Sequence, residues 1–499
     1  MPLDLSQKLI DPNDPANAPI FSQLQANILK GHGRNHSIHL FFAFTHDQPS
    51  GIGLALKGLP LSSAADQAQH HQQREKEPGY DGGTICTLAL SKEGMERLGA
   101  TLPGDRSFAA GMPSRQGCLG DPPVKDWDAG FQQAIHAMVL LADDHADRLE
   151  QQAQAVVASL AEVAQLVTQE RGVLLKNADG NVINHYDIVD GLSQPVFLTT
   201  DLERYKKRQG LEDVPREEWK YDPAVKLGEV LVTDVNGPNA DCYGSYGVYR
   251  KLHMDATKFW EGIEGLSKEL NEYQTNPDYA KQLATGYVIG RFKDGTPIIT
   301  HDQPTPGDPR VPNDFNYLPD PQGTKCPYSS HMRKVNPRSD IDPKLNPNPS
   351  LARRAISYGQ PGEADKGLLF LCMQGSIEEQ FEQIQIIWAN NQDFINPGTG
   401  IDPVVGQRKL VAAGEGHDNR CSRDVDPPSY GETPELPYGD APAGTYKNCY
   451  PREYGIEPLG WKRLCQNEAA FTPYDFARHV TMRGGLYLYY PSLGYLQNL

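Results

Sequence analysis

The residues best suited to chemistry lie in two stretches that are far apart in the sequence. In CPYSSHMRKVNPR, His331 precedes a polar and basic run, and Arg353 follows after a loop rich in Pro and Asn. The apolar stretch GLLFLCM at 367–373 comes soon afterwards. A histidine beside such a strand could bind a metal or a haem iron, and the arginine could stabilise charge on whatever the iron binds. The second stretch, HYDIVDGLSQP, offers Asp190 as a carboxylate for the same site.

Each of these residues also has an ordinary structural explanation. A single histidine is more often a hydrogen-bonded core residue than a metal ligand. Asp190 and Gly191 form a pair that is common in turns, and Arg353 and Arg354 could be two surface residues. Taken singly, these residues do not decide between a catalytic site and a structural one.

Three more histidines lie close together near the N-terminus, at positions His32, His36 and His39. Their number suggests a metal site. However, no carboxylates stand at ligand spacing beside them, and His39 falls within an alternating strand pattern. We therefore interpret these histidines as structural.

The composition is that of a globular protein and excludes several function classes. The 499 residues are 38% hydrophobic and 22% charged, with a net charge of −17. This acidic balance argues against nucleic acid and anionic membranes as partners, because phosphate binding needs a basic face. No apolar run approaches the roughly 20 residues of a membrane span, and no signal-peptide pattern is seen.

The eight cysteines indicate the cellular compartment in which the protein folds. None forms a CxxC pair or a zinc-binding spacing, so we expect reduced, buried thiols. Together with the missing signal peptide, this predicts a cytoplasmic protein, and release without a leader stays open as an alternative.

The order of elements predicts an α+β fold with two similar domains. Strands alternate with helices in the first half, as in a ferredoxin-like antiparallel sheet, and residues 101–131 read as loops. A second succession of strand and helix begins at Gly244. The two domains are therefore expected at 1–235 and 236–499. The expected strands are 37–44, 84–90, 135–141, one from 172, 367–373 and 484–490, and the main expected helices are 91–99, 144–165 and 376–390.

With these blocks in view, the chain resembles the longer members of the dye-decolorising peroxidase family. CPYSSHMRKVNPR, RRAISYG, GLLFLCMQ and VDGLSQP resemble its signature blocks, and LQANILKGHGRNHSIHLFF and GSYGVYRKL match further ones in order. The resemblance implies two ferredoxin-like domains. It also implies one non-covalent haem b per chain, bound mainly by the C-terminal half.

The resemblance also implies site residues, carried over position by position. His331 falls on the proximal ligand of the haem iron. Asp190 falls on the distal aspartate, which would move a proton between the two peroxide oxygens. Arg353 falls on the distal arginine, which would orient peroxide and stabilise charge. Leu368 and Phe370 match apolar positions that line the distal pocket.

Some details remain open at this level. The carboxylate that contacts the second nitrogen of His331 is sought among three residues of the helix at 376–390, namely Glu378, Glu379 and Glu382. Asp187 stands where the family motif has its first glycine, which puts the local turn in doubt. Arg354 is expected to face a haem propionate or solvent.

The resemblance implies a haem peroxidase that uses hydrogen peroxide to oxidise bulky aromatic donors and dyes through a ferryl intermediate. The alternatives are a haem-binding or haem-handling protein with little turnover, or a structural protein without haem. Donors too large for the pocket would need a surface Tyr or Trp as an electron relay, and some of Tyr487, Tyr489 and Tyr490 are expected to face outward. The sequence leaves open whether the chain forms a homo-oligomer.

Overall fold

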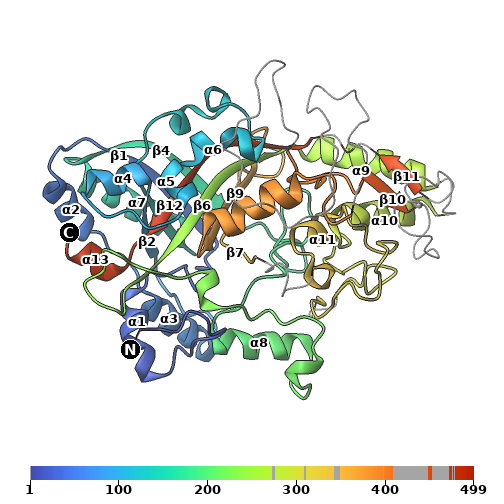
Figure 1. Cartoon of the computed structure of the whole chain (residues 1–499), viewed down its shortest axis with the longest axis horizontal. Coiled ribbons are helices and arrows are strands. Elements are labelled where there is room, and N and C mark those ends of the chain that lie inside the picture. Colours follow the sequence, from blue (N-terminus) through green and yellow to red (C-terminus); the bar gives the residue numbers. More distant parts are fainter. Residues whose placement is uncertain are drawn as a thin grey trace.

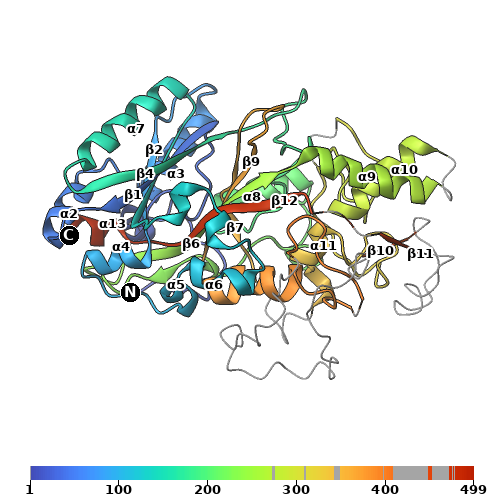
Figure 2. The same ribbon diagram turned by 90° about the horizontal axis from the view of Figure 1, so that it is seen from above.

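The structure is a computed structural model of the chain. It describes residues 2–271, 276–307, 311–341, 349–396, 398–407, 448–451, 471–474, 476 and 478–499. A large antiparallel barrel fills one end of the molecule, and helices α9 and α10 lie at the opposite end (Figures 1 and 2).

The N-terminal half contributes four strands in the order β2-β3-β1-β4. All neighbouring pairs are antiparallel, which is the arrangement expected of a ferredoxin-like sheet. β2 and β3 are buried along their whole length, so their apolar sequences face packed structure on both sides. The strands are β1 His36–Phe44, β2 Ile85–Leu90, β3 Ala137–Asp143 and β4 Ala164–Val173.

The C-terminal half repeats this arrangement in the order β12-β6-β9-β8. Two short strands, β5 Val232–Thr233 and β7 Ala352–Arg353, pair with β6 and β9. A separate pair, β10 Asn448–Pro451 and β11 Phe471–Tyr474, lies apart from this sheet. The main strands are β6 Tyr243–Met254, β8 Ile356–Tyr358, β9 Gly367–Gln374 and β12 Val480–Tyr490.

The two halves share one sheet. Tyr489 of β12 pairs with Leu90 of β2, and Val173 of β4 pairs with Ser357 of β8. Because β6 also pairs with β9, the strands close into a ring, β6-β12-β2-β3-β1-β4-β8-β9. This is the expected α+β fold with antiparallel ferredoxin-like halves. The boundary near residue 235 stays a prediction.

Side chains from both halves meet inside the barrel. Phe41 of β1 and Tyr249 of β6 lie on strands that are not neighbours, yet their ring centroids are 5.0 Å apart. Likewise, the ammonium of Lys251 on β6 lies 3.0 Å from Glu170 on β4 and 2.9 Å from Asp128. The barrel interior therefore joins the halves through apolar contacts and a half-buried group of charges.

Helices cover the outside of the barrel and form the opposite end. α7 packs on β1 and β3, and α4, α5 and α6 contact β12. The α-helices are α1 Ala18–Gln23, α2 Pro49–Lys57, α3 Ala64–Lys76, α4 Lys92–Arg97, α5 Arg106–Ala110, α6 Met112–Leu119, α7 Ala146–Leu160, α8 Thr199–Gln209, α9 Ala256–Asn271, α10 Pro277–Ile289, α11 His331–Val335 and α13 Leu493–Gln497. Ile377–Ala389 is a π-helix.

The expectation of loops over 101–131 was wrong. This segment holds α5 and α6 as well as the 3-10 turns Val124–Asp126 and Ala129–Gln132. The carboxylate of Asp105 caps α5 by accepting the backbone N–H of Phe108, and Gly111 separates the two helices with a φ of 76°. Further 3-10 turns are Pro15–Asn17, Arg216–Glu218, Leu227–Glu229 and Arg338–Asp340.

Two expectations about the whole chain can be compared with the structure. Cys86, Cys242, Cys326 and Cys372 are free and buried, as expected, but Cys118 is disulfide-bonded, so the expectation that all thiols are reduced was wrong. In the described part of the chain, none of the helices combines the length and the apolar character needed to span a membrane.

Candidate active site

His331 is the first residue of α11, and its ring is held by a buried carboxylate. Nδ1 of His331 lies 2.9 Å from Oδ2 of Asp402, whose side chain is fully buried. The other oxygen of Asp402 accepts the backbone N–H groups of Val404 and Val405 at 2.8 and 2.9 Å. These bonds fix the carboxylate and, through it, the orientation of the imidazole.

The His331–Asp402 pair also sets the charges at this point. Burial lowers the pKa of His331, but the charge and the hydrogen bond of Asp402 outweigh it, so the net pKa shift is upward. Burial raises the pKa of Asp402, and His331 more than offsets it, so that pKa is lowered. Asp402 is therefore an ionised acceptor, and Nδ1–H of His331 donates to it. In the neutral imidazole, Nε2 is then the nitrogen with a free lone pair.

The expectation that a glutamate of the π-helix contacts His331 was wrong. Glu382 accepts hydrogen bonds from Arg115, Ser107 and Tyr487, and Glu378 pairs with Arg106. These contacts direct both carboxylates toward α5, α6 and β12. Glu379 is exposed. The carboxylate that contacts Nδ1 of His331 belongs instead to Asp402, which lies 71 residues after His331.

Asp190 lies in a loop that β-type bridges hold in place. Its backbone N–H donates to Val182 O, and the neighbouring Val189 N–H donates to Lys293 O, both at 3.0 Å. The carboxylate accepts the N–H of Gly191 at 2.6 Å and remains half-buried. The loop therefore holds Asp190 at a fixed position with one oxygen still available.

Arg353 is tied to the same loop. Its guanidinium donates to Ser193 O at 2.5 Å, and its backbone N–H donates to the side chain of Gln194 at 3.1 Å. The charges of Arg353 and Asp190 both act on His331, the first lowering its pKa and the second raising it. The structure thus brings together His331, Asp190 and Arg353 from three distant segments.

Leu368 and Phe370 lie on β9 next to this group. Both are half-buried, while Leu369 and Leu371 between and beside them are fully buried. Arg353 pairs with Cys372 across β7 and β9, so its side chain points to the same face of the sheet as Leu368 and Phe370. The face beside Arg353 is therefore apolar and incompletely filled by protein.

Asp187 adopts a left-handed backbone conformation, which glycine reaches without strain. This accounts for the glycine at the same position of the family motif. The φ of Asp187 is 57°, in the left-handed region. Its exposed carboxylate forms an ion pair with Lys293 at 2.5 Å. The loop therefore has the backbone turn expected for a glycine, although the residue at this position is an aspartate.

Arg354 does not face solvent, which excludes one of its two expected positions; contact with a haem propionate stays a prediction. Only 8% of Arg354 is exposed, and its guanidinium donates to the carbonyls of Asn27, Ile28 and Arg353 at 2.6 to 2.9 Å. It therefore fastens the N-terminal loop to the strand that carries Arg353.

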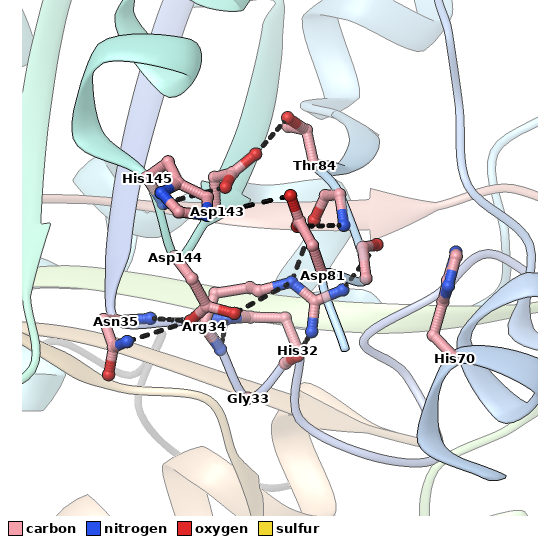
Figure 3. Close-up of polar contacts among 12 residues, drawn as sticks. His32, Gly33, Arg34, Asn35, His70, Asp81, Thr84, Asp143, Asp144 and His145 are labelled. Carbon is pink, nitrogen blue, oxygen red and sulfur yellow. Dashed lines mark hydrogen bonds and ion pairs between the residues drawn. The ribbon is translucent and has the colours of Figure 1, made fainter. Parts of the chain in front are cut away.

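A cavity of about 760 Å³ lies beside these arginines. Gly191 and Arg353 line one end, and a charged wall forms the other. Figure 3 shows this wall, in which Arg34 points toward Asp144. Arg34 also donates to the carbonyls of Gly82 and Gly83, so its position is fixed. The cavity thus extends from the loop after Asp190 to a rigid polar surface.

His32 and His39 are buried and take part in hydrogen bonds within the protein. The described residues contain no group of three His, Cys, Asp or Glu side chains able to hold a metal ion. Burial lowers the pKa of His32 to about 4 and that of His39 to about 3, so both are neutral near pH 7. His39 bonds to Ser37 at 3.1 Å inside the barrel.

The three tyrosines of the last strand are all buried, which overturns the expectation that some face outward. Tyr487 is 3% exposed, and Tyr489 and Tyr490 are fully buried. β12 lies in the middle of the closed sheet, between β6 and β2, with helices on its outer face. Both faces are therefore covered, and strand alternation does not lead to solvent here.

Comparison with known proteins identifies the family. A family model described as the DyP dimeric alpha+beta barrel domain matches residues 23–174, and one described as Dyp-type peroxidase, C-terminal matches residues 278–400. The multifunctional dye peroxidase DyP2 of Amycolatopsis sp. is 31% identical over 100% of both chains. The chain belongs to the dye-decolorising peroxidase family.

Solved structures agree with this assignment. DyP2 superposes on this dye-decolorising peroxidase with a TM-score of 0.83 over 100% of both chains. A DyP-type peroxidase from Anabaena sp. is 34% identical and gives a TM-score of 0.82, covering 99% of this chain and 98% of its own. The dye-decolorizing peroxidase msp1 of Mycetinis scorodonius is 27% identical over 81% of this chain and 80% of its own.

Members of this family are haem peroxidases, and the residues of the site fit that group. His331 is 26% exposed despite its buried partner Asp402, which leaves its Nε2 side accessible. Leu368 and Phe370 provide an apolar face that protein atoms fill incompletely, and Arg353 provides a cation beside this face. An imidazole with a carboxylate partner, an apolar wall and a cation are the groups that a haem with axial histidine requires.

Proposed function

We propose that this dye-decolorising peroxidase binds haem b at His331, reduces hydrogen peroxide and oxidises bulky aromatic donors, including dyes. The observation that carries the proposal is the position of His331, which has a buried carboxylate on Nδ1 and lies within electrostatic reach of Asp190 and Arg353. Haem iron would supply the two-electron reduction of peroxide. One haem per chain, a cytoplasmic location and any homo-oligomer remain predictions.

Each residue has a defined task in this proposal. Nε2 of His331 would hold the iron, and the negative charge of Asp402 would make the imidazole a stronger donor. Asp190 takes a proton from one peroxide oxygen and returns it to the other, as a base and then an acid. Arg353 orients peroxide and stabilises the charge that develops as the O–O bond breaks.

The surroundings suit a small oxidant more than a large donor. Leu368 and Phe370 would keep water from the reacting face, and the cavity beside Arg353 offers room for hydrogen peroxide. A haem-handling protein is not favoured, because storage needs neither Asp190 nor Arg353. Bulky donors are expected to react at the surface.

Stopped-flow absorbance of the haem-loaded protein with hydrogen peroxide tests the proposal. Asp190→Asn and Arg353→Leu should each slow the peroxide-induced change of the Soret band at least about 100-fold, because proton transfer or charge stabilisation is lost. His331→Ala should weaken haem binding itself. Full speed in Asp190→Asn would place the base elsewhere, and a Soret band without any peroxide response would support haem handling instead.

A further inference from the structure

A second, smaller cavity of about 250 Å³ lies between the N-terminal residues Pro12 and Asn13 and the helices α1, α3 and α8 (Figure 1). The N-terminal segment is fixed there, because the N–H of Ile10 donates to Phe197 O at 2.9 Å and the side chain of Gln72 on α3 donates to that of Asn13 at 2.6 Å. None of the residues given a task in the reaction lines this cavity. The reaction described above therefore leaves it without a role.

Apolar side chains form a large part of the lining. Phe21 of α1, Leu29 and Leu198 all line the cavity and are at most 5% exposed. On α3 the lining includes Ala64 and Ala68, which lie one turn apart on the same face of the helix. Their methyl groups leave space that longer side chains would fill. This lining favours a ligand with an apolar body, because its binding removes apolar surface from water.

An imidazole nitrogen without a hydrogen-bond partner belongs to the same lining. His71 lies on α3, three positions after Ala68. Its Nε2 atom is buried, and none of the described residues forms a hydrogen bond with it. Burial and the charge of Lys30 lower the pKa of His71 to about 3, so the ring is neutral near pH 7. A buried polar atom without a partner costs free energy, which a ligand group bonded to it would recover.

The charged side chains around this cavity balance one another. Lys30 forms an ion pair with Asp201, and Arg204 forms ion pairs with both Asp201 and Glu75. These four charges alternate in sign and sum to zero. Lys76 also lines the cavity, but it is exposed, so its charge is hydrated. A balanced network offers no net attraction that would offset the cost of burying an ion, and an uncharged ligand therefore suits the cavity.

We propose that this cavity binds a small uncharged phenol, with its hydroxyl on Nε2 of His71 and its ring against Phe21 and Leu198. The volume of about 250 Å³ is below the roughly 300–1,000 Å³ of pockets that enclose drug-sized ligands, so a single ring fits and a dye does not. An aromatic ring packs favourably on Phe21. A phenol hydroxyl both donates and accepts, so it pairs with either tautomer of His71, and with a pKa of about 10 it is uncharged at pH 7. Binding here requires neither haem chemistry nor peroxide.

The small cavity shares a loop with the large cavity of the candidate active site. Leu29 and Lys30 line the small cavity, whereas residues 31–35 line the large one, and Figure 3 shows most of the latter. Gln67 lines the small cavity and holds the loop, because its side chain accepts the N–H of Asn27 at 2.8 Å and donates to Lys30 O at 3.1 Å. A bound phenol would contact this part of the loop. We therefore expect phenol to slow amide hydrogen exchange at residues 27–34.

Fluorine NMR of 4-fluorophenol titrated into the haem-loaded protein, without peroxide, tests the site. We expect saturable binding to the native chain and an affinity about 10-fold lower in His71→Leu, because the hydroxyl loses its hydrogen-bond partner. The second probe, 4-fluorotoluene, has the same ring but no hydroxyl. It should bind the native chain more weakly than 4-fluorophenol does, and His71→Leu should not weaken its binding further.

Ala68→Leu tests the location without removing a polar group, since the larger side chain fills the cavity, and it should abolish binding of both probes. His70→Leu is the matched control, because His70 neighbours His71 on α3 but does not line the cavity, and it should bind 4-fluorophenol like the native chain. Cooperative unfolding in urea shows that each variant is folded.

The titrations also separate this cavity from the proposed haem site. Loss of 4-fluorophenol binding in Arg353→Leu, with binding kept in Ala68→Leu, would place the phenol beside the haem and overturn the inference. Native affinity in His71→Leu, or no saturable binding to the native chain, would overturn it as well. Because no peroxide is added, these outcomes do not depend on whether the protein is a peroxidase.

Discussion

At the scale of single residues, the pair of His331 and Asp402 determines how the proposed iron ligand behaves. A buried anion on Nδ1 gives the imidazole more electron density than a carbonyl partner would. As an iron ligand it would then stabilise ferric over ferrous iron. This property depends on one carboxylate that lies 71 residues away in the chain.

Asp402→Asn keeps the shape of the pair but removes its charge. We expect the midpoint potential of the haem to rise, because the less basic imidazole stabilises ferric iron less. Spectroelectrochemistry of the haem-loaded variant measures this change. Glu378→Gln is the matched control, since Glu378 pairs with Arg106 and does not contact His331. An unchanged potential in Asp402→Asn would mean that Asp402 only positions the ring.

Asp187→Gly tests whether the second carboxylate of the distal loop takes part in the chemistry. Glycine adopts the φ of 57° without strain, and the exposed ion pair with Lys293 is lost. These effects oppose each other, so the free energy of unfolding in urea should change by less than about 1 kcal/mol. The peroxide response should stay at the native rate. A large decrease in that rate would assign part of the proton transfer to Asp187.

At the scale of elements, Arg354 holds the N-terminal loop against the strand that carries Arg353. Arg354→Met removes the donors of three carbonyl groups, at Asn27, Ile28 and Arg353. We expect the free energy of unfolding to fall by about 3 kcal/mol, because these carbonyls are left without partners in a buried place. Arg171→Met is the control. Its ion pair with Glu150 is half exposed, so its loss should cost less than about 1 kcal/mol. Equal losses in both variants would contradict this role of Arg354.

The elements show which features could be read from the sequence. Most long strands of both halves were predicted because apolar runs such as 135–141 and 367–373 are distinct, and the π-helix Ile377–Ala389 was predicted as a helix. The expectation for β4 was wrong, because a helix was expected to reach residue 165 and a strand to begin at 172, whereas the strand spans Ala164–Val173. The family blocks pointed to His331, Asp190 and Arg353, which the structure brings together.

What the sequence missed depends on contacts between distant segments. Asp402 stands in an irregular, Pro-rich region with no periodic signal, so only the fold reveals its partner. Alternation along 484–490 suggested outward tyrosines, but helices α4, α5 and α6 pack on the outer face of β12, and its other face lies inside the barrel. The hydrogen bond between Tyr186 and His479 spans 293 positions and likewise leaves no local pattern.

At the scale of the whole molecule, buried neutral histidines make stability depend on pH. In the folded state the pKa of His39 is about 3 and that of His32 about 4, whereas an unfolded histidine titrates near 6.5. Between these values the unfolded chain binds protons that the folded chain does not. Stability is therefore lost as pH falls below 6.5, by up to about 1.4 kcal/mol per pH unit for each histidine.

His39→Gln tests this linkage through urea unfolding at a series of pH values from 7 to 4. We expect the variant to lose stability less steeply with acid than the native chain, whatever its stability at pH 7. His145→Gln is the control, because the side chain of His145 is 62% exposed. Parallel curves for the native chain and His39→Gln would show that other groups cause the acid sensitivity.

The position of β12 in the barrel also matters while the protein is being made. β12 fills the gap between β6 and β2, yet its residues leave the ribosome after both of those strands. Until residues 480–490 emerge, β6 and β2 carry open edges that can pair with another nascent chain. The barrel therefore closes only after residues 480–490 have been translated. Chaperones that shield strand edges during this interval should raise the yield of folded enzyme.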